Sequence, residues 1–372
     1  PARRYAVRAD VVYDGLGTPR GGGVVTVQRS GIGSNLVSVR AATHDKEDEP
    51  GTESLDAGFA ITPQPVNAHT HLDLSDMPFT PGGYVSFIEA VIDHGRSGAR
   101  GLPAARRGIE SLVAAGTTVV GDIVTKPDVM EYLLGQDEVS GVAYWEVLGP
   151  DPDSAEEVFE TTRVAIDGFR RLERPGGMRV GLSPHTPHTV SARLLTLLAG
   201  WARAEGLPLA IHVAESPAEA RLHLTGDGPI ADSFRRFGVP FQPSGVSPVA
   251  YLDSLGVLSA APTLVHMVAV DEDDVRAVQR HGCTVVHCPR SNEALACASA
   301  TGASACNAVP STNAWTVVAG VNHPASADTS HTAATPVRNV GTRKYSCACQ
   351  RSCTWLGRPA STASSARGAW PK

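Results

Sequence analysis

Two histidines separated by one residue are the first candidates for chemistry in this sequence. His69 and His71 lie in the segment Val66-Asn-Ala-His69-Thr-His71-Leu-Asp73. Side chains two residues apart in an extended segment point to the same side, so both imidazoles can approach one ion. Neutral imidazole is a common ligand of divalent metals. The pair therefore predicts part of a metal site, although a His-x-His pair also arises by chance.

A third histidine and a carboxylate follow another apolar stretch. His212 ends Ala210-Ile-His212, and Glu215 comes three residues later. A glutamate just past a metal ligand can accept a proton from water on the metal, whereas on a free surface it is an ordinary solvated charge. His266 and His287 end the next two apolar stretches. One histidine at a strand end is usually structural, but several in series favour a shared site.

These histidines need a scaffold that brings distant parts of the chain together. From residue 61 onward, apolar strands alternate with longer helical stretches, which is typical of βα units around a parallel sheet. Active sites of such barrels lie at the carboxyl ends of the strands, where the histidines fall. We predict strands at residues 61–67, 117–122, 141–147, 178–183, 207–212, 262–266 and 284–288, and helices at residues 104–115, 155–172, 190–204 and 271–281. The one candidate for the eighth strand of a barrel is 314–321.

The fold class predicted from this pattern is α/β: a (β/α)8 TIM-like barrel with a small β-sandwich domain. The amino-terminal part contains short strand patterns at residues 5–13, 24–27 and 36–39, separated by glycine-rich turns. We expect a small β domain at 1–60, a metal-dependent hydrolase barrel at 61–297 and an anomalous tail rich in Ala, Ser and Thr at 298–372.

The tail differs in composition from the rest of the chain. It holds one of the 38 acidic residues, Asp328, and four of the seven cysteines. Glu and Met are absent there and Leu356 is its one leucine, which together with the near loss of carboxylates suggests the hypothesis of an out-of-frame translation. The spacing of Cys347, Cys349 and Cys353 superficially resembles a metal cluster, but a biased composition produces such spacings by chance. An ordinary low-complexity tail is the alternative.

Composition excludes several classes of protein. The 372 residues are 42% hydrophobic and 19% charged, which is typical of a soluble globular protein. A net charge of −6 gives no reason to expect a nucleic-acid partner. No apolar run is long enough for a transmembrane helix. The first residues lack a secretory signal, and the seven cysteines form no disulfide framework in so long a chain. We therefore expect a cytoplasmic protein without a membrane partner.

Five motifs in order resemble the amidohydrolase superfamily, specifically its cytosine deaminase and chlorohydrolase-like branch. The resemblance covers roughly residues 5–297. Residues 146–150 and 182–187 are in addition similar to the aminodeoxyfutalosine deaminases of menaquinone biosynthesis. The motifs are Asn67-Ala-His69-Thr-His71, Ser183-Pro-His185-Thr-Pro, His212-Val-Ala-Glu215, Leu264-Val-His266 and His287-Cys-Pro-Arg-Ser-Asn292.

The resemblance implies a function and roles for individual residues. The reaction would be hydrolytic deamination of an aminopurine nucleoside, such as aminodeoxyfutalosine. Glu215 would move the proton and His266 would orient the attacking water or stabilise developing charge. His185 would face the small-molecule substrate, and Asn292 would brace the seventh loop. The ligands of one divalent metal, zinc or iron, would be His69, His71 and His212.

One departure from the family pattern leaves alternatives open. The family has an aspartate at the end of strand eight, near residue 317, where this chain has Val317-Val318. Asp328 is a poor substitute in position. The alternatives are hydrolysis of an amide, guanidine or chloro-triazine, and a barrel remnant without catalysis. The resemblance also suggests a homodimer. His188 is a further candidate for the substrate pocket, whereas structural roles are expected for His94, His223 and His281.

Overall fold

The computed structural model describes residues 3–13, 20–30, 33–41, 52–56, 60–79, 82–297 and 317–318. The chain divides into two compact units, Pro1–Pro65 and Val66–Lys372. Predictions that concern the other residues of the tail, including Asp328 and the cysteines after residue 300, lie outside the described residues.

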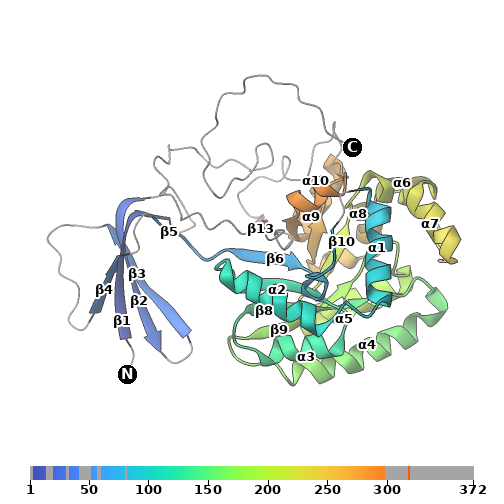
Figure 1. Cartoon of the computed structure of the whole chain (residues 1–372). Coiled ribbons are helices and arrows are strands. Elements are labelled where there is room, and N and C mark those ends of the chain that lie inside the picture. Colours follow the sequence, from blue (N-terminus) through green and yellow to red (C-terminus); the bar gives the residue numbers. More distant parts are fainter. Residues whose placement is uncertain are drawn as a thin grey trace, which may run out of the picture. The chain divides into compact units, whose positions relative to one another are not determined.

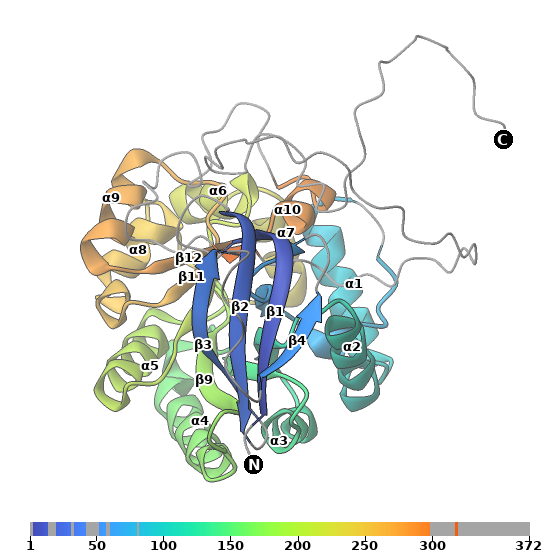
Figure 2. The ribbon, with the colours of Figure 1, turned by 90° about the vertical axis from the view of Figure 1, so that its left-hand side faces the viewer.

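The first unit contains a five-stranded sheet in the order β3-β2-β1-β4, with β5 also paired to β1 (Figure 2). β1 and β2 are antiparallel, as are β2 and β3, whereas β4 and β5 run parallel to β1. Ala9, Val12 and Val25 form its small core. The described residues supply one sheet, so the second sheet of a sandwich stays a prediction. The strands are β1 (Arg3–Val12), β2 (Arg20–Ser30), β3 (Gly33–Ala41), β4 (Thr52–Asp56) and β5 (Ala60–Ile61).

The second unit is built on parallel strands in two runs, β6-β7-β8-β9 and β10-β11-β12-β13 (Figure 1). A parallel bridge from Leu182 in β9 to Leu209, just before β10, joins the runs, and β13 lies beside β6. The strands thus close into the barrel that the repeated strand–helix pattern predicts. They are β6 (Val66–Thr70), β7 (Val119–Val124), β8 (Ser140–Val147), β9 (Met178–Pro184), β10 (Ala210–Val213), β11 (Thr263–His266), β12 (Thr284–His287) and β13 (Val317–Val318).

Helices follow the strands and begin at recognisable caps. The side chains of Ser191, Ser216 and Ser247 each accept a backbone N–H in the first turn, and Asp271 forms a capping box with Asp274. The helices are α1 (Tyr84–Arg96), α2 (Leu102–Ala114), α3 (Pro127–Gly135), α4 (Ala155–Arg170), α5 (Ala192–Glu205), α6 (Pro217–Thr225), α7 (Pro229–Phe237), α8 (Pro248–Ser254), α9 (Glu272–His281) and α10 (Pro289–Ala294), with short 3-10 turns η1 (Leu72–Leu74), η2 (Pro152–Ser154) and η3 (Val257–Ala260).

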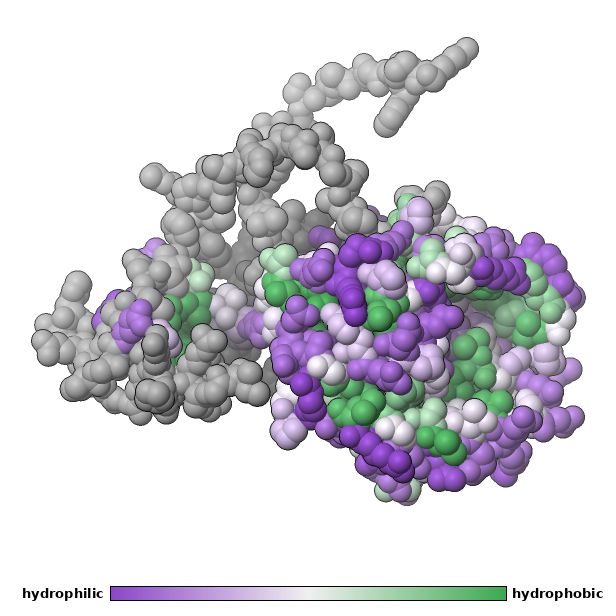
Figure 3. All heavy atoms as spheres, turned by 60° about the horizontal axis from the view of Figure 1, so that its bottom comes forward, coloured by the Kyte–Doolittle hydropathy of each residue, from purple (hydrophilic) through white to green (hydrophobic). Residues whose placement is uncertain are grey.

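The helices pack an apolar face on the strands and leave a polar face outside. In α4 the buried side chains include Ile166 and Phe169, while Val164 on the other face is 64% exposed. On the face of the molecule in Figure 3, hydrophilic side chains predominate and hydrophobic areas are interspersed among them. No described helix is long and apolar enough to cross a membrane.

The first barrel strand begins later than predicted. The structure ends β5 at Ile61 and starts β6 at Val66, so residues 62–65 of the predicted strand are irregular. Pro63 and Pro65 fall in this gap, and a proline has no N–H to donate to a sheet. The predicted helix 155–172 likewise ends at Arg170. The eighth-strand candidate 314–321 contains β13.

Candidate metal centre and active site

The structure brings His69, His71 and His212 together. His69 lies in β6, His71 directly follows that strand, and His212 lies in β10. The ring centroid of His69 is 5.0 Å from that of His71 and 4.8 Å from that of His212. One ring nitrogen from each residue lies within 4.8 Å of the others. We refer to these three residues as the strand-end cluster.

The protonation of the strand-end cluster suits a metal. Burial, followed by the charge of neighbouring imidazoles, holds the pKa of His69 and of His71 well below the usual value. Burial also lowers the pKa of His212 to about 3. Nδ1 of His212 lies 3.0 Å from the carbonyl oxygen of His185, to which it can donate only as N–H, so Nε2 keeps its lone pair.

An unpartnered nitrogen supports the same fit. Nδ1 of His71 is buried and has no hydrogen-bond partner among the described residues. Leaving such a nitrogen unpaired in the interior is unfavourable, and a metal ion would satisfy it. Neutral imidazoles with available lone pairs are the donors that zinc and iron accept. The cluster therefore fits one divalent metal.

Glu215 and His266 lie next to each other beside the cluster. Nε2 of His266 is 3.5 Å from Oε1 of Glu215. The ring centroids of His266 and His69 are 5.7 Å apart. Burial raises the pKa of Glu215 to about 8 and lowers that of His266 to about 4. A carboxyl group with such a pKa can both hold and release a proton near neutral pH.

The backbone next to Glu215 and at His266 adopts left-handed conformations, and hydrogen bonds hold the turn before Glu215. Ala214 has φ 52° and His266 has φ 80°, both in the left-handed region that favours glycine. The carboxylate of Glu219 accepts the N–H groups of Ala214 and Glu215 at 3.0 and 2.8 Å. These bonds hold the turn that carries Glu215.

Asn292 lies in the segment after β12, and its side chain also contacts His266. Oδ1 of Asn292, on α10, lies 3.0 Å from Nδ1 of His266 at the end of β11. The imidazole donates this hydrogen bond because the amide oxygen only accepts. Asn292 thus connects the helix after β12 to His266. His287 donates from Nδ1 to the carbonyl of His266 at 3.0 Å and is buried.

His185 faces Glu146 near the strand-end cluster. Nε2 of His185 is 4.0 Å from Oε1 of Glu146, and Nδ1 lies 2.9 Å from Oγ1 of Thr189. Its ring centroid is 5.4 Å from that of His212. Burial lowers the pKa of His185 to about 4 and raises that of Glu146. A part-exposed neutral imidazole opposite a buried carboxyl group can offer hydrogen bonds to a polar molecule.

Arg100 is a charged residue near the cluster that the sequence did not single out. Its Nε donates to Oδ2 of Asp73 at 2.7 Å, and Thr125 donates to the same oxygen at 2.9 Å. The charge of Arg100 contributes to the lowered pKa of His71. Arg100 and Asp73 are 27 residues apart, so no local spacing predicts the pair.

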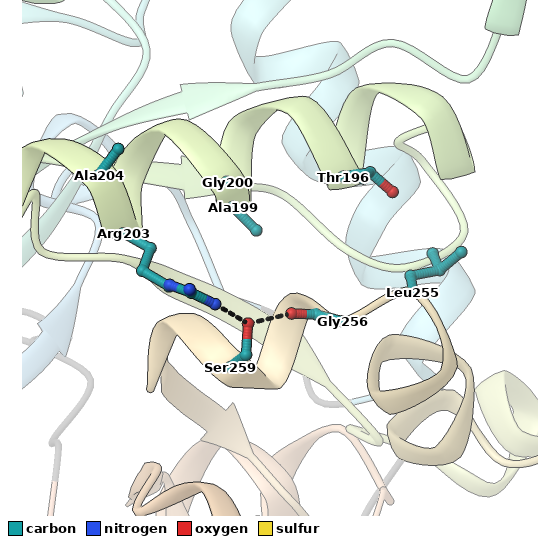
Figure 4. Close-up of a pocket in the computed structure, with 8 residues that line it drawn as sticks. All are labelled: Thr196, Ala199, Gly200, Arg203, Ala204, Leu255, Gly256 and Ser259. Atoms are coloured by element: carbon teal, nitrogen blue, oxygen red, sulfur yellow. Dashed lines mark hydrogen bonds between the residues drawn. The ribbon is translucent and has the colours of Figure 1, made fainter.

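A surface pocket lies between α5 and η3, where Arg203 donates to Oγ of Ser259 at 3.2 Å (Figure 4). None of its lining residues belongs to the strand-end cluster or its neighbours. The pocket therefore contributes nothing to the chemistry of the strand-end cluster.

Comparison with known proteins places the chain in a family. The model of the amidohydrolase family matches residues 60–313. The aminodeoxyfutalosine deaminase of Deinococcus radiodurans is 47% identical over 301 residues, which are 77% of this chain and 70% of that protein. The 5-methylthioadenosine/S-adenosylhomocysteine deaminase of Nitratidesulfovibrio vulgaris is 26% identical over 66% of this chain, which spans about half (53%) of that relative.

A solved structure supports the same fold. The crystal structure of Helicobacter pylori aminofutalosine deaminase in complex with methylthio-coformycin matches with a TM-score of 0.67 and 17% identity. The match covers 78% of this chain and 71% of that one. Together with the matched family model, these findings establish that the chain belongs to the amidohydrolase family.

Proposed function

We propose that this chain is a metal-dependent aminohydrolase that replaces the exocyclic amino group of aminodeoxyfutalosine, an aminopurine nucleoside, with oxygen from water. The observation that carries the proposal is the meeting of three imidazoles from two barrel strands beside a buried glutamate. The 47% identity to a deaminase with this substrate supports the choice of nucleoside.

The proposed metal is one divalent zinc or iron ion held by His69, His71 and His212. When bound in a dry site, such an ion lowers the pKa of water from about 15.7 to roughly 7, which makes a nucleophile available at neutral pH. Imidazole suits both metals, so the donor set does not choose between them.

Glu215 is proposed to move the proton. It takes a proton from the attacking water and delivers it to the ring nitrogen next to the carbon under attack, as the new C–O bond forms. The remaining hydroxyl proton then passes to the amino group, the C–N bond breaks, and the amino group leaves as ammonia. The pKa of about 8 lets the carboxyl group hold that proton between the two steps. A general acid–base step of this kind contributes on the order of 10²- to 10⁴-fold.

His266 and His185 are proposed to position the reactants. His266, fixed by Asn292 and 3.5 Å from Glu215, orients the water or stabilises the negative charge that develops. His185 binds the substrate with a side chain that is 22% exposed. A neutral imidazole can accept one hydrogen bond and donate another, which suits a ribose or a carboxylate.

A barrel remnant without catalysis is the second candidate, and one observation favours it. β13 pairs with β12 through Val317 and Val318, at the position where the resemblance places an aspartate. A valine can neither bind a metal nor accept a proton. This candidate predicts a folded chain without turnover.

Ammonia release separates the two candidates. The chain loaded with zinc or iron would be assayed for ammonia with aminodeoxyfutalosine, adenosine and 5′-methylthioadenosine, and for chloride with a chloro-triazine. The proposal predicts the highest kcat/KM with aminodeoxyfutalosine. Activity confined to the chloro-triazine would contradict the choice of substrate. A folded chain that retains no metal after supplementation would favour the remnant.

The organisation of the whole chain is part of the proposal. We propose a small β-sandwich domain at residues 1–60, a hydrolase barrel at 61–297 and an anomalous tail rich in Ala, Ser and Thr at 298–372, which comes from another reading frame or is an ordinary low-complexity tail. We further propose that the chain acts in the cytoplasm as a homodimer. Resequencing the gene tests the tail, because an uninterrupted native frame through residue 372 would exclude the hypothesis. Sedimentation measurements test the dimer.

A further inference from the structure

A second cluster of potential metal ligands lies outside the strand-end cluster. His188 follows β9, while Glu219 and His223 are four residues apart on α6 and therefore lie on one helix face. Their relative exposures are 5%, 1% and 0%. One ligand atom from each residue lies within 4.8 Å of the others, a limit that the strand-end cluster also meets. We refer to His188, Glu219 and His223 as the helix cluster.

Two nitrogens in the helix cluster lack partners. Nδ1 of His188 and Nε2 of His223 are fully buried and make no hydrogen bond within the described part of the chain. Nδ1 of His188 lies 3.8 Å from Oε1 of Glu219, which is beyond hydrogen-bond distance. Buried polar atoms of this kind are rare in proteins, because each one forfeits its bond to water.

The partner of the other nitrogen of His223 fixes its tautomer. Nδ1 lies 3.3 Å from Oγ of Ser244. That hydroxyl has carbonyl oxygens within reach at Val246, 3.2 Å, and at His223 itself, 3.4 Å, so its hydrogen goes to a carbonyl. The hydroxyl then accepts from Nδ1–H, and Nε2 is left with a lone pair. Metal-binding histidines commonly donate their other N–H in this way.

Glu219 is held in place from the opposite side. Its Oε1 accepts the N–H of Ala214 at 3.0 Å and its Oε2 accepts that of Glu215 at 2.8 Å. Each carboxylate oxygen has further acceptor capacity. The surroundings are aromatic: ring centroids of Phe234, Phe241 and Tyr251 lie 5.3 to 5.8 Å from an imidazole of the cluster. Water is thus a poor partner for these groups.

We propose that His188, Glu219 and His223 form a second site for a divalent transition metal of the zinc class. Two imidazoles and one carboxylate are an established donor set for zinc. Zinc bonds of about 2.0 Å place tetrahedral ligands about 3.3 Å apart, so small side-chain rotations must draw these atoms together. A cation would satisfy both unpartnered nitrogens and the buried carboxylate at once.

Such a metal stabilises the turn before α6. Because Glu219 accepts the N–H groups of Ala214 and Glu215, an ion bound to its carboxylate ties α6 to the end of β10. This consequence for Glu215 rests on the proposed function, whereas metal binding itself does not. Metal stoichiometry therefore tests the second site independently of turnover.

The test counts zinc in the full-length chain after incubation with ZnCl2 and removal of free ions. We expect two zinc ions per chain in the wild type, and one in the variant His223→Phe, whose ring matches the aromatic surroundings. The double variant His69→Ala/His71→Ala is expected to retain one zinc ion. The triple variant His69→Ala/His71→Ala/His223→Phe is expected to retain none. The matched control is His281→Gln, because His281 bonds Asp253 and belongs to neither cluster; it should retain two.

A second measurement guards against loss of folding. The thermal midpoint of each variant is recorded in EDTA to show that the metal-free variant is folded. Glu219→Gln is also examined with Co2+, whose visible absorption reports coordination of the ion by the helix cluster. That absorption should be lost in Glu219→Gln/His69→Ala/His71→Ala and present in His69→Ala/His71→Ala. One zinc in the wild type that is lost in folded His69→Ala/His71→Ala, or undiminished zinc in a folded His223→Phe variant, would overturn the proposal.

Discussion

The strand-end cluster and the helix cluster each hold three candidate ligand atoms within 4.8 Å of one another, but they are attached to the fold differently. In the strand-end cluster the donors are imidazoles only, and Glu215 and His266 lie beside them. In the helix cluster one donor is a carboxylate that also holds two backbone N–H groups. Reactive neighbours thus distinguish a site suited to catalysis from one suited to holding a turn.

The charges of the two clusters also differ in a way that favours catalysis at the strand-end cluster. Three neutral imidazoles would leave a bound dication with its full charge, which strengthens its effect on water. In the helix cluster the carboxylate of Glu219 would offset part of that charge. Aromatic rings border the helix cluster, whereas His185 at the strand-end cluster is part-exposed. The comparison therefore predicts larger losses of activity from changes in the strand-end cluster.

The largest expected effect is on the strand-end cluster itself. His69→Ala/His71→Ala removes two of its three donors, so we expect kcat/KM for deamination to fall by at least about 10⁴-fold, because the acid–base step has no activated water to act on. His223→Phe should lower it by about 10- to 100-fold, as changes that only reorient reacting groups do. Steady-state ammonia release measures both. Equal losses would erase the distinction between the clusters.

Glu215 is expected to give the next largest effect. Glu215→Gln keeps the shape of the side chain but removes its acid–base function, so kcat should fall about 10²- to 10⁴-fold with unchanged metal content. Glu272→Gln is a suitable control, because Glu272 is a glutamate on α9 with a side chain that is 87% exposed. A Glu215→Gln variant with wild-type kcat would remove the carboxylate from the mechanism.

The sequence predicted the strand-end cluster because its signal is local. An apolar stretch that ends in histidine marks a strand end, and the barrel topology makes strand ends converge. The predicted first barrel strand starts at Ile61, although Pro63 and Pro65 interrupt the backbone pairing before β6 begins at Val66. The sequence therefore predicts which side chains of this strand point toward the site, but it does not predict where the strand begins.

The helix cluster escaped prediction because its signal is not local. Glu219 and His223 are spaced like any solvated i, i+4 pair on a helix. Their burial depends on Phe234 and Phe241, which come from α7 and the segment after it. The sequence therefore favours a structural role for His223 and offers His188 only as a candidate for the substrate pocket. Arg100 was missed for a similar reason, since its partner Asp73 is remote in sequence.

A smaller effect is expected from the support of His266. Asn292→Leu removes the acceptor 3.0 Å from Nδ1 of His266, so the imidazole can turn, and we expect a fall in kcat of up to about 100-fold. The free energy of unfolding should fall by about 1–3 kcal/mol, because the N–H is left unpaired in the interior. Asn292→Asp restores an acceptor and should recover part of kcat. No recovery would assign Asn292 a packing role only.

The smallest expected effect is a pH dependence that belongs to the helix cluster. Burial raises the pKa of Glu219 to about 8 from an ordinary value of 4.5, so in the metal-free protein the folded state binds the proton more tightly than the unfolded state. Its contribution to stability is fully present below pH 4.5 and is lost as the pH rises through 8.

Thermal midpoints at pH 6 and pH 9 in EDTA measure this dependence. Between pH 6 and pH 9 the thermal midpoint of the wild type should fall by more than that of Glu219→Gln. The extra fall should be about 2–4 °C for each kcal/mol of linked free energy. Glu215 titrates in both proteins, so the difference between them isolates Glu219. Zinc should reduce the difference, because a cation beside the carboxylate favours its ionised form. A difference that zinc leaves unchanged would mean that Glu219 titrates without a metal, and only the strand-end cluster would then remain a metal site.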